Sequence, residues 1–405
     1  MRPANGAGAK AVTPTATDIS VMQGALLVIL CAVGTGCGSS SDPAGGADGG
    51  GGGVDAAGQA DWLYPEPDWT TGAPEDHGID PAGLEDAAAA AEQHRSHCLL
   101  VIKGGVLVFE RYFAGTDATT LNRSWSIAKS YTGTLVGIAI ERGEIAGLEQ
   151  TVAELVPEWA GSDRAAITVG DLVRMTSGLE WSVFQDYVQM AVFADDHTAF
   201  AVDLAVDAAP GTGWTYNNGA VQVLERVIRN ATGMTLEAYA AEHLWSRIGM
   251  TGSWEHDPAE NPTAYANALA TCRDHARFGY LYLRGGRWAG GAEVVPPAWV
   301  EQALTPSQEF NRAYGFLFWL NGQTPAMTSL NEAKDEELVP FAPDDLFAAR
   351  GFGNQFIDVI PSLDLIVVRF GADPVTEFDP EALADDARFD QHDEILRPVL
   401  EAVDP

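Results

Sequence analysis

The sequence predicts a mixed α/β (α+β) protein in which a mainly antiparallel sheet, formed by the N- and C-terminal segments, has flanking helices and a mainly helical insertion. Three observations indicate this arrangement. Residues 98–113 contain two apolar runs around paired glycines, residues 355–370 contain two more around a short turn, and the stretch between these regions is mostly helical in pattern. Because strands do not alternate regularly with helices, a doubly wound parallel sheet is the weaker interpretation.

Two hairpins account for the ends of this sheet. Gly104 and Gly105 interrupt the first apolar region, which is typical of a glycine turn between antiparallel strands. Near the C-terminus, residues 355–360 and 365–370 flank a polar turn. The last of these runs is apolar except for Arg369, which predicts a strand buried on both faces.

Capping patterns predict where two helices between the terminal hairpins begin. Thr168 with Asp171, and Thr271 with Asp274, are capping-box signatures. We expect these two helices to end near Gly178 and Gly285, and further helices to cover residues 220–229 and 236–245.

The composition fits one large folded domain and argues against nucleic acid as a partner. Of the 405 residues, 46% are hydrophobic and 20% are charged, which excludes disorder throughout. The 57 acidic and 23 basic residues leave a formal net charge of -34, so a basic surface that follows a phosphate backbone is not expected.

The first 37 residues have the features of an export signal. Residues 25–33 form an apolar run that follows Arg2 and Lys10 and is too short to span a bilayer. Cys37 comes after small residues, and this resembles a bacterial lipoprotein signal in which the cysteine is lipidated. An ordinary cleaved signal peptide is the alternative. Both interpretations predict an exported protein of the periplasm or cell envelope, with membrane contact only through a lipid on Cys37.

A glycine-rich linker is predicted to follow, at residues 38–60. It contains no aromatic and almost no aliphatic side chain, so it cannot recover the entropy lost on ordering. As a flexible chain it would reach roughly 25–30 Å. The folded domain is therefore predicted for residues 61–405, with its helical insertion at about residues 126–260.

Two cysteines, Cys98 and Cys272, remain in the folded domain. Export permits a disulfide between them, and two unpaired buried cysteines are the alternative. His94 and His97 lie close to Cys98, but one short cluster without a second ligand group favours a solvated helix end over a metal site. No metal or organic cofactor is expected.

The segment Ser124–Tyr131 contains a serine and a lysine that suit nucleophilic catalysis. Ser126 and Lys129 are three residues apart, which places them one turn apart on the same side of a helix. A serine hydroxyl is a weak nucleophile until a neighbouring base takes its proton. A lysine in an apolar pocket can act as that base because desolvation lowers its pKa. Only four of the 23 basic residues are lysines, so a titratable amine at this position is informative.

Two further segments gain significance from this pair. Residues 210–219 are rich in glycine and asparagine and by themselves indicate a loop. Beside a serine and a lysine, the phenol of Tyr216 is a candidate base, and the amide of Asn218 could bind a substrate carbonyl or hold the lysine. Residues 349–355 precede a strand, and their glycines would let a substrate approach N–H groups that stabilise an oxyanion.

In this order, the three segments resemble the motifs of the serine β-lactamase and penicillin-binding-protein superfamily, whose first motif is Ser-x-x-Lys. They look most like the β-lactamase-related branch, which includes class C β-lactamases, DD-peptidases, family VIII esterases and aminohexanoate-oligomer hydrolases. The resemblance covers about residues 75–400. Its supporting phrases are Met175–Leu179, Arg273–Gly279 and Tyr314–Trp319.

The resemblance implies acyl transfer and a role for each candidate residue. Ser126 would be the acylated nucleophile, Lys129 its activator, Tyr216 the general base and Asn218 a substrate-orienting group. Whether Lys129 or Tyr216 takes the serine proton stays open, and the two would titrate as a coupled pair. The oxyanion hole would consist of the backbone N–H groups of Ser126 and Gln355.

The position of Gln355 follows from matching Phe352, Gly353 and Asn354 to the third motif of the family. β-Lactamases and DD-peptidases usually have Lys or His at the first position of this motif, near the substrate carboxylate, whereas this chain has Phe352. Arg350 has the same strand parity, but it lies about 6–7 Å away along a strand. This difference favours an esterase or small-amide hydrolase.

Tyr187 is a further candidate. It belongs to the phrase Gln185–Val188, which is similar to a segment of the aminohexanoate-oligomer hydrolases, and it would be either a substrate contact or a packing residue. The predicted function is therefore a serine hydrolase that acts on a small-molecule ester or amide. A β-lactamase or DD-peptidase, and a non-catalytic binding or sensor module on the same fold, are the alternatives.

Overall fold

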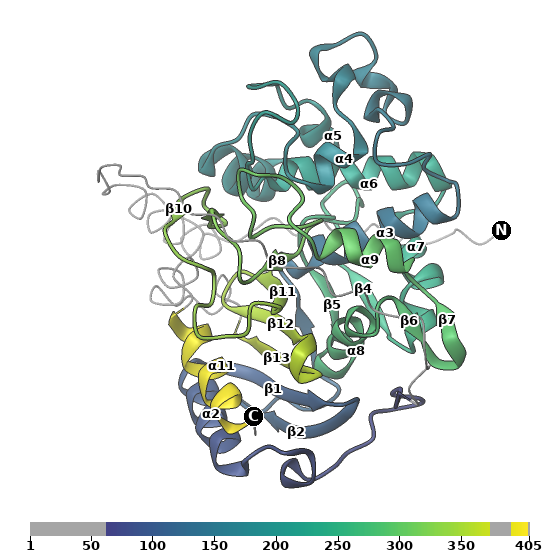
Figure 1. Ribbon diagram of the computed structural model, residues 1–405. Coiled ribbons are helices and arrows are strands. Elements are labelled where there is room, and N and C mark those ends of the chain that lie inside the picture. Colours follow the sequence, from purple (N-terminus) through teal and green to yellow (C-terminus); the bar gives the residue numbers. More distant parts are fainter. Residues whose placement is uncertain (1–61, 373–389, 404–405) are drawn as a thin grey trace, which may run out of the picture.

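The central sheet is formed by both ends of the chain, as the sequence predicts (Figure 1). The computed structural model describes residues 62–372 and 390–403. The predicted leader, Cys37 and the glycine-rich linker lie outside these residues. Six antiparallel strands follow the order β2-β1-β13-β12-β11-β8. Their bounds are Ser96–Lys103 for β1, Val106–Tyr112 for β2, Trp319–Leu320 for β8, Phe347–Gly351 for β11, Gln355–Ile360 for β12 and Leu365–Gly371 for β13.

Both predicted hairpins are present. Gly104 and Gly105 connect β1 to β2 with φ angles of 60° and 84°, a left-handed conformation that glycine adopts at little cost. A short 3-10 turn, Pro361–Leu363, connects β12 to β13. These turns depend on local chemistry, which explains why they could be predicted.

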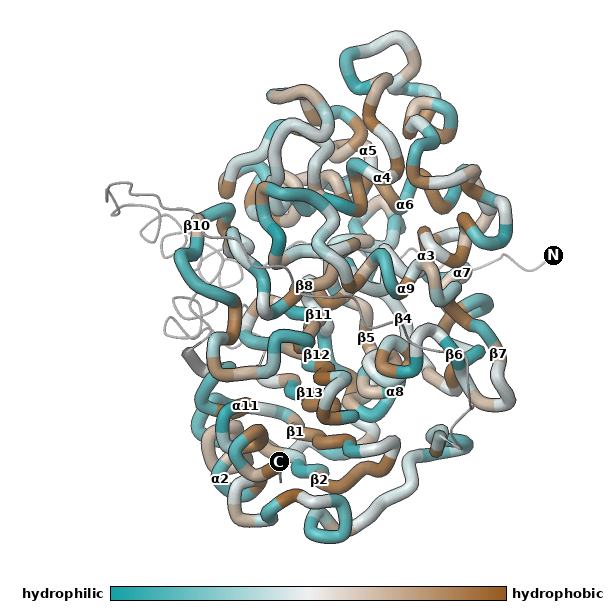
Figure 2. Tube along the Cα trace, in the orientation of Figure 1, coloured by the Kyte–Doolittle hydropathy of each residue, from teal (hydrophilic) through white to brown (hydrophobic). Residues whose placement is uncertain are grey.

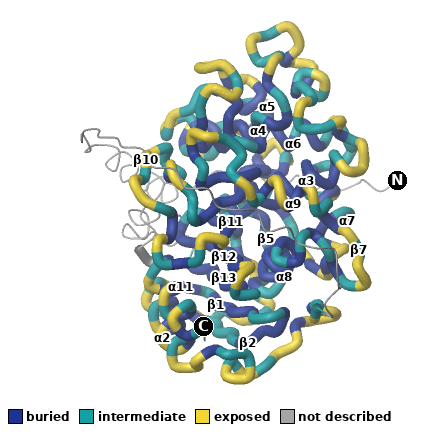
Figure 3. The backbone as a smooth tube through the Cα atoms, viewed as in Figure 1, coloured by how far each residue is buried: buried dark blue, intermediate teal, exposed yellow. Residues whose placement is uncertain are grey.

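Helices cover both faces of the sheet. Helix α2 (Pro81–Gln93) packs against the C-terminal helix α11 (Asp390–Ala402) and against β1, while α8 (Cys272–Leu283) packs against β12 and β13 (Figure 1). Strand β13 is consequently buried along its whole length. Figure 2 shows hydrophobic residues concentrated in the central strands, and Figure 3 shows that the same strands are buried.

Helix α4 of the insertion and helix α8 after it begin where the capping patterns predict. The Thr168 and Asp171 side chains form a complete capping box, and Thr271 caps α8. Helix α4 ends before Gly178, because Met175 takes a φ of 61° and turns the chain out of the helix. The bounds are Ile127–Glu141 for α3, Val169–Val173 for α4, His197–Val202 for α5, Asn218–Thr232 for α6 and Leu236–His243 for α7.

A small second sheet, which the sequence does not predict, pairs strands from the beginning and the end of the helical insertion. Its order is β3 (Leu121–Arg123), β5 (Ala268–Thr271) and β4 (Gly252–Trp254). A disulfide between Cys98 and Cys272 ties β1 to the start of α8 next to this sheet. The disulfide is thus the alternative that the structure supports.

The remaining elements are short, and none of the helices in the described part of the chain is both long and apolar enough to cross a membrane. They include the π-helical segment η5 (Gln185–Phe193), helix α9 (Pro297–Ala303), strands β6 (Arg287–Trp288), β7 (Ala292–Glu293), β9 (Ala326–Met327) and β10 (Ala333–Lys334), and 3-10 turns at Pro74–His77, Val152–Glu154, Pro157–Trp159, Asp163–Ala166, Trp245–Ile248 and Ala289–Gly291.

Candidate active site

Ser126 stands at the point where the small sheet meets helix α3. It is the N-cap residue of α3, and Trp125 before it takes a φ of 47°, which is unusual for an aromatic residue. Two backbone hydrogen bonds fix this turn: the Ser124 N–H donates to the Ala268 carbonyl at 2.9 Å, and the Asn267 N–H donates to the Trp125 carbonyl at 3.2 Å. The serine is therefore held on a sharp, well-supported turn.

Lys129 lies one helical turn further and points back at Ser126. Its Nζ donates to the Ser126 Oγ at 2.7 Å and to the Tyr265 carbonyl at 2.8 Å. The lysine is only 1% exposed. Burial lowers the pKa of Lys129 to about 7, against an opposing effect from the charge of Asp186. A large part of this amine is therefore neutral near pH 7, which a base requires.

The ring of Tyr216 lies beside the same amine. The Lys129 Nζ is 4.8 Å from the centre of this ring. The ring stacks on Trp319 at 5.6 Å and meets Tyr314 edge-on at 6.1 Å. The structure thus brings Ser126 and Lys129, which lie three residues apart, together with Tyr216 from a segment about 90 positions later in the sequence.

Asn218 is the first residue of α6 and is buried close to the same region. Its Oδ1 atom has no hydrogen-bond partner among the residues that the structure describes. The neighbouring Asn217 has a structural role, because its side chain accepts the Ala220 N–H at 3.0 Å and caps the helix. Of these two asparagines, Asn218 is therefore the one whose side-chain oxygen could accept a hydrogen bond from a substrate.

A buried carboxyl group, Asp186, completes this side of the site and was not predicted. It lies on η5, is 4% exposed, and accepts the N–H groups of Asn218 and Gly219 at 3.2 Å each and the Trp181 indole N–H at 3.0 Å. Burial raises its pKa, and the hydrogen bonds and the Lys129 charge oppose this. The candidate Tyr187 is the next residue on η5 and is half-buried.

The third predicted segment forms the turn between β11 and β12. Gly353 and Asn354 adopt φ angles of 76° and 56°, and Arg369 donates to both of their carbonyl groups at 2.7 and 3.0 Å. The ring of Phe352 lies edge-on to Trp125 at 5.3 Å. Phe352 therefore places an aromatic surface next to the serine turn, where the family usually has a cation or donor.

Gly351, at the end of β11, makes the close backbone contact with the serine turn. A Cβ atom there would lie 2.3 Å from the Ser124 carbonyl oxygen, so only glycine fits. Gln355 lies across the hairpin on β12, and its side chain accepts the Gly371 N–H at 2.7 Å. Residues 351 and 352 thus pack directly on the serine turn. The expected role of the Gln355 backbone N–H in an oxyanion hole stays a prediction.

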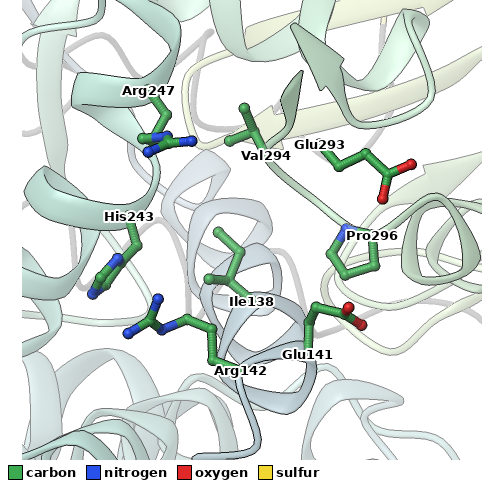
Figure 4. A pocket seen from close by; sticks show the side chains of 8 residues that line it. All are labelled: Ile138, Glu141, Arg142, His243, Arg247, Glu293, Val294 and Pro296. Carbon is green, nitrogen blue, oxygen red and sulfur yellow. The ribbon is translucent and has the colours of Figure 1, made fainter. Parts of the chain in front are cut away.

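A hollow in the described part of the chain lies away from these residues. It has a volume of about 370 Å³ and lies at the opposite end of α3, about 18 Å from Ser126 along the helix (Figure 4). None of the predicted site residues lines it. The lining residues are Ile138, Glu141, Arg142, His243, Arg247, Glu293, Val294 and Pro296.

The histidines near Cys98 have partners of their own. His94 pairs with Glu394 at 2.6 Å, and the ring of His97 hydrogen-bonds the Asn122 side chain at 2.9 Å. In residues 62–372 and 390–403, no group of three or more His, Cys, Asp or Glu side chains is placed to hold a metal ion.

Curated proteins similar to this chain include a hydrolase and a penicillin-binding protein. The chain is 28% identical over 240 residues to the 6-aminohexanoate-dimer hydrolase of Paenarthrobacter ureafaciens, which covers 55% of this chain and 60% of that protein. It is 26% identical over 211 residues to penicillin-binding protein 4 of Amycolatopsis lactamdurans, covering 44% and 54%. The chain thus matches less than two thirds of the length of either relative.

Solved structures share the fold. A candidate 6-aminohexanoate-dimer hydrolase from Bacillus anthracis superposes with a TM-score of 0.64 at 20% identity, covering 84% of this chain and 88% of that one. The hydrolase EstCE1 gives 0.58 at 14% identity, covering 75% and 99%. The family model for Beta-lactamase matches residues 82–390. The fold, the order of the segments and this match over most of the sequence agree, and the chain belongs to the beta-lactamase family within the serine β-lactamase and penicillin-binding-protein superfamily.

Proposed function

We propose that this protein is a serine hydrolase that cleaves an ester or amide through an acyl-enzyme on Ser126. One observation carries the proposal: a fully buried lysine, with its pKa lowered by burial, lies 2.7 Å from the hydroxyl of Ser126. Burying an amine without a counter-charge in direct contact is costly, so a module that only binds ligands would gain nothing from it. This argues against the non-catalytic alternative.

The reaction has two acyl-transfer steps. In the first, Lys129 or Tyr216 takes the proton of Ser126, and the Oγ atom attacks the substrate carbonyl carbon. The resulting oxyanion accepts hydrogen bonds from the Ser126 N–H and from the Gln355 N–H, with the Phe352 N–H at the end of β11 as the alternative second donor. The intermediate then expels the alcohol or amine, which takes the proton. In the second step, water attacks the acyl group, releases the carboxylic acid and restores Ser126.

The surroundings of Ser126 favour an uncharged, apolar group next to the scissile bond. Trp125 and Phe352 form an aromatic edge beside the serine. An aromatic ring cannot pair with a carboxylate, so it gives no affinity for the carboxylate of a β-lactam or of a D-alanyl peptide. Two of the similar proteins are named as 6-aminohexanoate-dimer hydrolases and a third, EstCE1, as a hydrolase with acyltransferase activity, and these names support acyl transfer on an amide or ester.

A β-lactamase or DD-peptidase is the second candidate, and Arg350 is the observation in its favour. Arg350 lies on β11, two residues before Phe352, and could receive a carboxylate there. The likeness to penicillin-binding protein 4 supports this alternative.

We also propose export, with a lipid on Cys37 as the means of retention at the membrane. The Cys98–Cys272 disulfide supports export, because such bonds persist in oxidising compartments. Mass spectrometry of the protein from a secreting host tests it: a diacylglycerol-modified Cys37 N-terminus is expected, and an intact leader would contradict export.

Intact-mass spectrometry tests the catalytic proposal. The protein is exposed separately to a fluorophosphonate, a panel of p-nitrophenyl esters and small amides, and penicillin. We expect a fluorophosphonate adduct on Ser126, turnover of at least one ester or amide, and neither adduct nor turnover with penicillin. Ser126→Ala is the control. Full esterase activity in this variant, or an adduct on another residue, would refute the assignment, and a penicillin adduct on Ser126 would favour the second candidate.

A further inference from the structure

We propose that Asn331 is a positioning residue that fixes Tyr216 against Lys129 through its side-chain amide. The inference rests on the proposed serine hydrolase mechanism, in which Tyr216 must keep a set position relative to Lys129 and Ser126.

The amide of Asn331 pairs with both polar groups of the Tyr216 backbone. Its Oδ1 accepts the Tyr216 N–H at 2.5 Å, and its Nδ2 donates to the Tyr216 carbonyl at 3.3 Å. Tyr216 belongs to no helix or strand and is buried. One side chain, 115 positions later in the sequence, thus supplies hydrogen bonds of the kind that a neighbouring strand would otherwise give.

A preformed turn holds this amide in place. Asn331 lies in the turn between β9 and β10 with a φ of 62°. The Thr328 hydroxyl accepts the N–H groups of Leu330 and Glu332 at 3.3 and 3.2 Å, and the Thr328 N–H donates to the Glu332 carbonyl at 2.8 Å. At the base of the hairpin, the Met327 N–H donates to the side chain of the fully buried Asn311 at 3.1 Å. The turn is therefore organised independently of Tyr216.

The same stretch of chain also supports the ring of Tyr216. Tyr314 and Trp319, which contact this ring, lie between Asn311 and the hairpin. Ring and peptide are thus held by one segment, residues 311–334. The ring centre is 4.8 Å from the Lys129 Nζ, so a movement of the Tyr216 peptide moves the phenol relative to the amine. Proton transfer requires donor and acceptor atoms about 2.6–3.2 Å apart. A shift of about 1 Å in the Tyr216 peptide is therefore expected to slow the reaction by about 100-fold.

Two variants change the hydrogen bonds of the Asn331 side chain while its backbone conformation stays accessible. Asn331→Gly keeps a φ of 62° accessible but loses both hydrogen bonds, whereas Asn331→Asp keeps an acceptor for the Tyr216 N–H and loses the donor. Asn230→Ala is the matched control, because the Asn230 amide also donates to a backbone carbonyl, that of Leu155 at 2.7 Å, far from Ser126.

The readouts are the rate at which a fluorophosphonate labels Ser126, kcat and KM on a p-nitrophenyl ester, and the midpoint of thermal unfolding. We expect Asn331→Gly to slow labelling and lower kcat by about 10- to 100-fold with KM within about 3-fold, and Asn331→Asp to recover part of this loss. Asn230→Ala should label at the wild-type rate.

The outcomes distinguish this inference from the proposed function. If wild-type Ser126 is labelled and both Asn331 variants label within about 2-fold of it, Asn331 has only a structural role, whatever happens to the unfolding midpoint. If Asn331→Gly does not fold, the rate of Asn331→Asp decides in the same way. If wild-type Ser126 is never labelled, the proposed function fails and the inference fails with it.

Discussion

Replacing Asp186 with asparagine should move the acid limb of the pH profile to lower pH. In the proposed mechanism, activity rises with pH as Lys129 loses its proton, near its pKa of about 7. The groups facing its Nζ are Asp186 from η5, the rings of Tyr216 and Tyr265, and Ser126. Among these, Asp186 favours the charged amine. Asp186→Asn removes that effect, so the pKa of Lys129 falls and activity persists at lower pH.

The size of the shift follows from the Coulomb interaction. A unit charge at about 10 Å, at an effective dielectric constant of about 20, contributes about 1.7 kcal/mol, which corresponds to roughly one pH unit. Stability should also fall. Asp186 accepts three N–H donors, and an asparagine amide would face at least one of them with its NH₂ group. Leaving a buried donor unpaired lowers the free energy of unfolding by about 1–3 kcal/mol.

The assay is kcat/KM for a p-nitrophenyl ester between pH 5 and 9. Trp181→Phe is the control, because it removes one hydrogen bond to Asp186 and leaves the charge in place. We expect its acid limb at the wild-type position. If the limb of Asp186→Asn stays in place or moves to higher pH, Lys129 is not the group that titrates, and Tyr216 becomes the preferred base.

Three further predictions test other parts of the structure. Lys129→Ala should slow fluorophosphonate labelling of Ser126 by about 100- to 10,000-fold, the contribution expected of a general base, and an unchanged rate would remove Lys129 from the mechanism. Gly351→Ala should lower kcat by about 100-fold because its Cβ would displace the Ser124 carbonyl. Gly115→Ala controls for backbone strain alone, because its Cβ meets nothing within 4 Å although its φ is 80°; equal activities of the two variants would contradict the close packing. Replacing Cys98 and Cys272 together with alanine should lower the free energy of unfolding in urea by about 2–5 kcal/mol, since the disulfide closes a long loop, and an unchanged denaturation midpoint would refute this.

Local signals explain what the sequence could predict of the fold. The hairpins depend on Gly104, Gly105 and the turn at residues 361–364, and the starts of α4 and α8 depend on caps within four residues. The segment η5 has no such signal, because a π-helix lacks the 3.6-residue period on which helix prediction depends.

The site residues likewise include some that a local sequence pattern predicts and others that only packing reveals. Ser126 and Lys129 could be paired from their spacing alone, because a helix brings residues three apart together. Asp186 is one of 57 acidic residues, and only packing reveals that it is buried at the start of α6. Asn331 reaches Tyr216 from 115 positions away through a turn that no single-residue pattern predicts.

The strongly acidic composition and the neutral lysine are compatible because they act over different distances. Solvent-exposed carboxylates are screened within about 8–10 Å at moderate ionic strength, whereas the charge of the buried Asp186 is screened much less. The pKa of Lys129 therefore depends mainly on its own desolvation and on Asp186. It follows that raising the salt concentration should move the acid limb less than Asp186→Asn does. A limb that followed ionic strength instead would mean that the surface charge, and not the buried pair, sets the working pH of the site.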